Sequence, residues 1–100
     1  MNVIDIKNQK NVPLSYCIGR LIRKARIEND LTGSELAKRV YLSQQQISRY
    51  ERGQTGFQVD VLLRLLLALD MDEYEIKNFF SSVIEQTSKK SVRKKNYSSN

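Results

Sequence analysis

The stretch of sequence that decides the fold runs from Thr32 to Gly53 and reads TGSELAKRVYLSQQQISRYERG. Glu35 follows Thr32 by three residues, and Gln46 follows Ser43 by three residues. Each pair has the form of a capping box, in which a hydroxyl and a carboxyl or amide group bond unpaired backbone amides at the start of a helix. Gly53 is a typical helix stop. The stretch therefore predicts two short helices joined by a tight turn.

The second of these helices carries polar side chains on its outward side. It begins with Ser43 and three glutamines, and glutamine can make paired hydrogen bonds to adenine in the DNA major groove. Ile47 and Tyr50 form its apolar pair, so residues 43, 44, 45 and 49 share the opposite side. Three glutamines alone would be explained better as a solvated helix face. Behind a serine cap and a tight turn, they indicate a helix-turn-helix that reads DNA.

Helical periodicity continues on both sides of this stretch. A first helix is expected from Pro13 to about Asn29, and Gly19 within it indicates close packing. Another is expected from about Gln58 to Leu69, and its nearly continuous apolar character implies a central helix or a face shared with a partner. With a last helix after residue 72, we expect an all-α fold of five helices. The folded domain covers residues 13–85, with the helix-turn-helix at about 32–52, a flexible arm over 1–12 and a basic disordered tail over 86–100.

The charge is distributed unevenly along the chain of 100 residues, whose net charge is +6. Residues 20–54 carry eight basic and four acidic side chains, whereas residues 55–87 carry two basic and six acidic ones. The last thirteen residues carry five basic side chains and no acidic one. The basic half of the core thus coincides with the expected helix-turn-helix, which favours a polyanionic partner. Two interpretations of the tail stay open: a solvated segment, or a sequence-independent attraction to phosphates.

The residue inventory argues against an enzyme, a metal site and a membrane protein. One cysteine and no histidine permit neither an internal disulfide nor a Cys/His zinc site, and Cys17 is expected in the core. No paired carboxylates or activated nucleophile suggest catalysis, so no metal, cofactor or small-molecule substrate is expected. No apolar run resembles a signal peptide, and the longest apolar stretch, residues 61–69, is too short to span a bilayer. We expect a cytoplasmic, nucleoid-associated bacterial protein with no membrane partner.

The motifs resemble those of the phage-repressor-like Cro/C1 (XRE) helix-turn-helix family over about residues 18–75. The resemblance rests on Leu-Thr-x-x-Glu-Leu-Ala at 31–37, Ser-Gln-x-x-Ile-Ser-Arg-Tyr-Glu-Arg-Gly at 43–53 and the leucine-rich helix that follows. It implies a lambda-repressor-like DNA-binding domain. The run 43–53 is further similar to fimbria-linked regulators of the MrpJ type, which are encoded with adhesive-fimbria operons and repress flagellar motility genes.

The resemblance assigns roles to residues at the matching positions. Base edges of double-stranded operator DNA would be read by Ser43, Gln44, Gln45 and Arg49. Backbone phosphates would be held by Thr32, Ser34, Arg52, Gln54 and the amide of Gly53. Arg26 and Glu51 would form a partly buried, structural salt bridge.

Two positions depart from the family pattern. The first helix of the motif usually opens with glutamine, which supports a phosphate and the first reading residue, and here that position is Gly33. The turn commonly has glycine, and here it has Tyr41. Tyr41 must therefore adopt an unusual backbone angle, or the turn must have another shape.

These features together predict a sequence-specific transcriptional regulator that represses promoters by occupying operator DNA. A homodimer is expected, because one recognition helix reads only a few base pairs. Tyr74, Phe79 and Phe80 are candidates for the dimer contact, with a place in the core as the alternative. A phage-type repressor or an antitoxin-type autoregulator would share the same motifs. A protein-interaction module on the same scaffold is the alternative of another class, although its surface would more often expose aromatic side chains.

Overall fold

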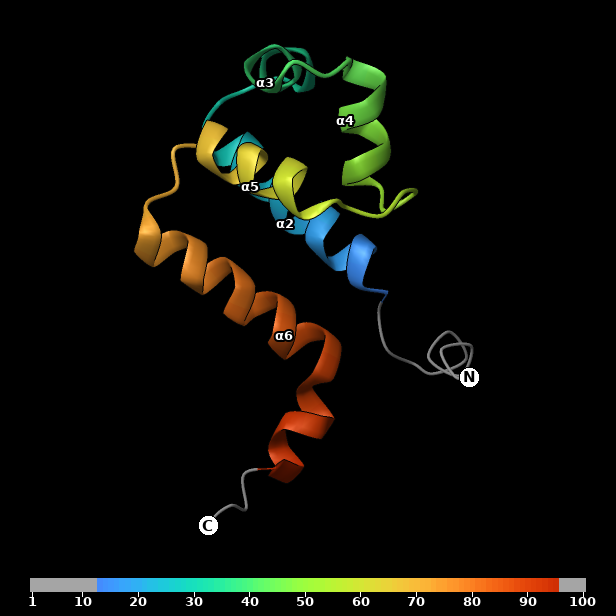
Figure 1. The fold of residues 1–100 in the computed structure, drawn as a ribbon, viewed down its shortest axis with the longest axis vertical. Helices are drawn as coiled ribbons and strands as arrows, with labels where there is room; N and C mark the ends of the chain where they lie inside the picture. Colours follow the sequence, from blue (N-terminus) through green and yellow to red (C-terminus); the bar gives the residue numbers. More distant parts are fainter. Residues whose placement is uncertain (1–12, 96–100) are drawn as a thin grey trace.

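The computed structural model describes the backbone of residues 13–95 and the side chains of residues 13–87, and over this range the protein is all-α. Its helices are α2 (Leu14–Glu28), α3 (Gly33–Val40), α4 (Gln44–Glu51), α5 (Val59–Ala68) and α6 (Glu73–Lys95) (Figure 1). The prediction of five helices without strands is confirmed for the described residues. The expected arm over 1–12 and the end of the expected tail, 96–100, lie outside them.

Helix α2 packs against α4 of the helix-turn-helix, and a glycine in α2 allows the two backbones to come into contact. A Cβ atom added at Gly19 would lie 2.3 Å from the carbonyl oxygen of Tyr50 and 2.8 Å from that of Glu51. Both distances are well inside van der Waals contact, so only glycine fits where α2 passes the end of α4. The close packing predicted at Gly19 is therefore confirmed. Around this contact, Cys17, Ile18 and Ile22 of α2 are buried.

The core gathers one apolar face from each helix. Leu36 of α3, Ile47 of α4, and Leu65 and Leu66 of α5 are at most 1% exposed. Helix α5 is not buried all round: Val59, Leu63 and Leu67 recur every four residues on its other side and are exposed. The buried apolar faces of α3 and α4 hold these two helices against the core. The apolar outer side of α5 is not covered by the described part of the chain.

Helix α6 is longer and faces the core differently from the expectation. It continues to Lys95, so the expected disorder from residue 86 is wrong for residues 86–95. No proline or glycine interrupts residues 73–95, and lysine and arginine are good helix formers that favour a helix C-terminus. The expectation that Phe79 forms a dimer contact is also wrong. Phe79 is 6% exposed and packs in the core, with its ring 5.3 Å from that of the more exposed Phe80.

Candidate nucleic-acid interface

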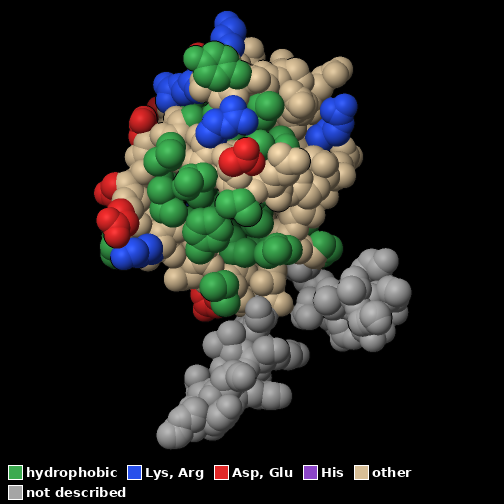
Figure 2. All heavy atoms as spheres, in the orientation of Figure 1, with side chains coloured by type: hydrophobic (Ala, Val, Ile, Leu, Met, Phe, Trp, Pro, Cys, Tyr) green, Lys and Arg blue, Asp and Glu red, His purple; other side chains and the backbone are tan. Residues whose placement is uncertain are grey.

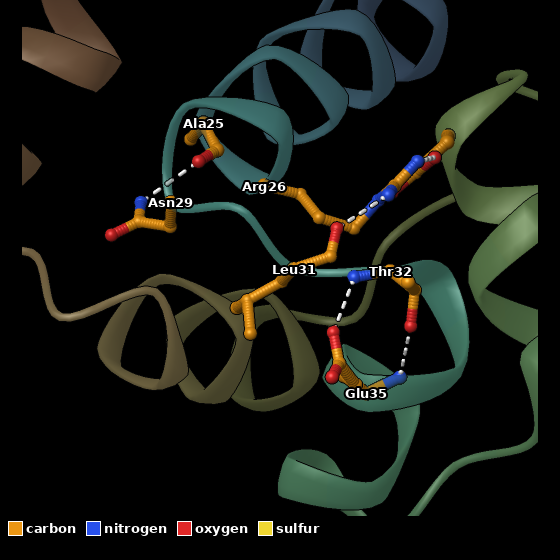
Figure 3. A network of polar contacts seen from close by, with 7 residues as sticks. Ala25, Arg26, Asn29, Leu31, Thr32 and Glu35 are labelled. Atoms are coloured by element: carbon orange, nitrogen blue, oxygen red, sulfur yellow. Dashed lines mark hydrogen bonds and ion pairs between the residues drawn. The ribbon is translucent and has the colours of Figure 1, made fainter.

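Two capping boxes fix where α3 and α4 begin. The hydroxyl of Thr32 accepts from the amide of Glu35 at 3.0 Å, and the Glu35 carboxylate accepts from the amide of Thr32 at 2.8 Å (Figure 3). Ser43 and Gln46 repeat the arrangement at the start of α4, at 3.1 and 2.9 Å. Both predicted caps are present. The bonds with Thr32 lower the pKa of the Glu35 carboxyl, because they favour its charged form.

The turn between α3 and α4 spans residues 41–43, and its first residue adopts the left-handed conformation. Tyr41 has φ 59° and ψ 41°, and its side chain is 89% exposed. The amide of Leu42 donates to the carbonyl oxygen of Ala37 at 3.0 Å and closes the turn. Of the two possibilities that the sequence left open, the chain adopts the unusual backbone angle. This conformation costs a residue other than glycine about 1–2 kcal/mol, and the exposed ring adds no compensating burial.

A buried ion pair holds α4 against α2. Arg26 donates from Nε to Glu51 Oε2 at 2.6 Å and from Nη2 to Glu51 Oε1 at 3.0 Å, while its Nη1 donates to the carbonyl oxygen of Leu31 at 2.8 Å. The Arg26 and Glu51 side chains are 14% and 7% exposed. The hydrogen bond to Glu51 raises the pKa of Arg26. The predicted pair is thus present, and it also fixes the α2–α3 loop beside it (Figure 3).

The outward side of α4 is exposed as its pattern indicated. Ser43, Gln44, Gln45 and Arg49 have exposed side chains, whereas Ile47 is buried and Tyr50 half-buried against the ring of Phe57. One shallow depression brings together residues expected to read bases and residues expected to hold phosphates. It is lined by Gln45, Ser48, Arg49, Arg52 and Gln54. The start of α4 can therefore enter a groove without obstruction from the described chain.

Comparison with known proteins identifies the family. The model of the helix-turn-helix family HTH_3 matches residues 22–76, more than half of the chain. The chain belongs to this family. Its helix-turn-helix is of the Cro/C1 type, and the protein is accordingly a DNA-binding transcriptional regulator. Among curated proteins no significant match is found.

A solved helix-turn-helix regulator has a similar fold. The clp gene regulator ClgR from C. glutamicum is 20% identical and superposes with a TM-score of 0.68. The alignment covers 78% of this chain and 96% of the ClgR chain. At 20% identity, this similarity establishes a shared arrangement of the helices and no more than that.

Not every expected contact of the helix-turn-helix is available to DNA. Thr32, Ser34, Arg52 and Gln54 have exposed side chains, as a role at phosphates requires. The expectation for the amide of Gly53 is wrong, because that amide already donates to the carbonyl oxygen of Tyr50 at 3.1 Å. Gly53 has φ +73°, and its Cβ would lie 2.6 Å from Cα of Tyr16. It ends α4 and packs on α2, so its role is structural.

One residue near the helix-turn-helix was not anticipated from the sequence. Arg23 of α2 lines a depression beside Gly33 and Gln44, the first residues of α3 and α4. Its position, one turn before Arg26, was the available signal, since side chains three residues apart share a helix face. Over the described residues, no group of three or more acidic, cysteine or histidine side chains could hold a metal ion. Nor is any of the described helices apolar over a length that would cross a bilayer.

Proposed function

We propose that the protein is a sequence-specific repressor that inserts the start of α4 into the major groove of operator DNA. One observation carries the proposal: the side chains of Gln44, Gln45 and Arg49 project from a capped helix and make no hydrogen bond or ion pair with other residues in 13–87. Amide and guanidinium groups in this position can make paired bonds to adenine and guanine. Ser43 lies beside them, and Thr32, Ser34, Arg52 and Gln54 flank them as phosphate contacts.

The repressor would act as a homodimer, with two half-sites one helical turn apart. Support comes from an apolar surface on the face where α5 and α6 lie (Figure 2). Tyr74 is 72% exposed, Phe80 is 38% exposed, and Ile84, Leu63 and Leu67 are exposed as well. Replacing Tyr74 and Phe80 together with serine should shift sedimentation from dimer to monomer. A wild-type protein that sediments as a monomer at high concentration would remove this part of the proposal.

The similarity of residues 43–53 to MrpJ-type regulators is the basis for a proposal about the genes under control. We propose flagellar motility genes as targets and a fimbrial operon as the genetic neighbourhood, with the cytoplasm and its nucleoid as the place of action. A prophage would instead favour a phage-type repressor, and a toxin gene an antitoxin-type autoregulator. A gel shift separates these from a protein-interaction module, in which the same residues would bind a protein and not DNA.

The test of DNA reading is a binding assay with a matched control. Purified protein, at physiological salt and with random-sequence competitor, should enrich a defined sequence from a pool of randomised duplexes. Replacing Gln44, Gln45 and Arg49 with alanine should abolish the enrichment. Gln58→Ala, which removes an exposed glutamine at the start of α5, should leave it intact. Wild-type protein that enriches no sequence would refute sequence-specific binding.

A further inference from the structure

A shallow depression lies between α2, α3 and α4, where α3 and α4 both begin. Gly33 and Gln44, the first residues of these helices, line it together with Ser48 of α4 and Arg52, the residue that follows α4. Arg23 lines it from α2. All three helices therefore contribute residues to the lining of the depression, and one of these is Gln44, a proposed base-reading residue.

The depression carries an excess of positive charge. Arg26 and Glu51 also line it, but their charges compensate each other, and Arg26 also donates to the carbonyl oxygen of Leu31. Arg23 and Arg52 are exposed, and neither guanidinium group makes a hydrogen bond or an ion pair within residues 13–87. Three guanidinium groups thus share the depression with one carboxylate, which leaves two positive charges available to an anion.

Gly33 keeps the depression open. A Cβ atom added there would lie 3.8 Å from Cγ of Gln44 and 4.0 Å from Cγ2 of Ile47, which is ordinary contact distance. A side chain at position 33 would therefore fit and would occupy this space. With glycine, the space is left to a ligand and to the long side chain of Arg23.

We infer that this depression is a binding site for a phosphate of the DNA backbone, and that Arg23 supplies the contact that residue 33, having no side chain, cannot make. The inference rests on the proposed function. A planar guanidinium binds two phosphate oxygens at once, so Arg23 and Arg52 can hold a phosphate between them. Such a phosphate lies beside Gln44, and holding it fixes the register of α4 on the duplex. The DNA surface then includes α2 as well as the helix-turn-helix.

The first test compares Arg23→Ala with Lys24→Ala on the duplex that the wild-type protein enriches. Lys24 is the next residue of the same helix and is also exposed, but it does not line the depression. Arg23→Ala should weaken binding about tenfold and reduce the slope of log affinity against log salt by about one per protomer, uniformly across sequence variants. Lys24→Ala should leave the slope unchanged. Equal effects of the two variants would overturn the inference while the proposed function stands, whereas wild-type protein that binds no duplex overturns both.

A second test asks whether Arg23 acts through the space at Gly33. Adding Gly33→Gln to Arg23→Ala should restore several-fold of the lost affinity, because a glutamine amide can donate to a phosphate from the same space. Gly33→Gln alone should change affinity less than about twofold, so the two substitutions should be non-additive. Strictly additive effects would overturn the inference. Circular dichroism checks that all variants keep their helices.

The source of the phosphate is settled by adding inorganic phosphate. Phosphate should compete weakly with the duplex and should perturb the NMR signals of the Arg23 side chain and the Gly33 amide. If inorganic phosphate saturates these signals without displacing the duplex, the depression binds a free anion and not the DNA backbone. That result would also overturn the inference.

Discussion

Breaking the Arg26–Glu51 pair by Glu51→Ala should cost about 3–5 kcal/mol of the free energy of unfolding. The two side chains are 14% and 7% exposed, and two hydrogen bonds of 2.6 and 3.0 Å join them. Without Glu51, the guanidinium stays in a poorly hydrated position with one bond, to the carbonyl oxygen of Leu31. A domain of this size has a total stability of about 5–10 kcal/mol, so the variant should be close to unfolding.

Two control variants separate burial from charge in this prediction. Glu73 and Lys77 form an exposed pair at 3.2 Å, with exposed fractions of 84% and 72%. Glu73→Ala should therefore cost about 0.5 kcal/mol or less. Replacing both Arg26 and Glu51 with methionine removes both charges and leaves only the Leu31 carbonyl oxygen without its donor. That double variant should cost about 1–3 kcal/mol, less than Glu51→Ala alone.

Urea unfolding at neutral pH, followed by circular dichroism, measures these differences. The order of stability should be wild type, Glu73→Ala, the double methionine variant and then Glu51→Ala. A loss of unfolding free energy below about 1 kcal/mol for Glu51→Ala, comparable with that of Glu73→Ala, would refute the reasoning. An unpaired buried charge should destabilise the domain by more than the loss of an exposed ion pair does.

Three further perturbations test the packing, the turn and the cap. Gly19→Ala should destabilise the domain by about 3 kcal/mol or more in the same assay, because its Cβ would meet the carbonyl oxygen of Tyr50 at 2.3 Å; a neutral effect would contradict the close contact. Tyr41→Gly should stabilise it by about 1 kcal/mol and raise its melting temperature, since glycine adopts φ 59° without strain; a lower melting temperature would show that the ring contributes. Hydrogen bonds with Thr32 lower the pKa of the Glu35 carboxyl. Its contribution to stability is therefore present above the pKa of the unfolded state and is lost as pH falls through the pKa of the folded state. Glu35→Gln should flatten this acid part of the stability profile, and an unchanged profile would exclude the contribution.

The helix-turn-helix could be predicted from the sequence because its signals are local. Thr32 and Ser43 were placed correctly as caps, since each capping box needs only residues three apart. The outward side of α4 followed from Ile47 and Tyr50 at helical spacing. The strained turn at Tyr41 could be posed as one of two possibilities, because a residue other than glycine at that point forces a choice between them.

Features that depend on how helices pack could not be predicted in the same way. Phe79 and Phe80 are adjacent, and only the rotation of α6 against the core decides that the first is buried. The polar composition after residue 85 indicated disorder, but it contains no helix stop, and α6 continues to Lys95. Arg23 lies beside the first residues of α3 and α4 because α2 packs against α4; its spacing from Arg26 places the two on one face of α2 but does not specify this packing.

The central claim is that the outward side of α4 reads base pairs, and Gln44 tests it most directly. Relative affinities of wild type and Gln44→Ala should be measured for every single-base variant of the enriched duplex. The account predicts that discrimination falls by about 1–3 kcal/mol at one position of each half-site and persists at the others. A uniform loss of affinity at all positions, or an unchanged profile, would contradict it.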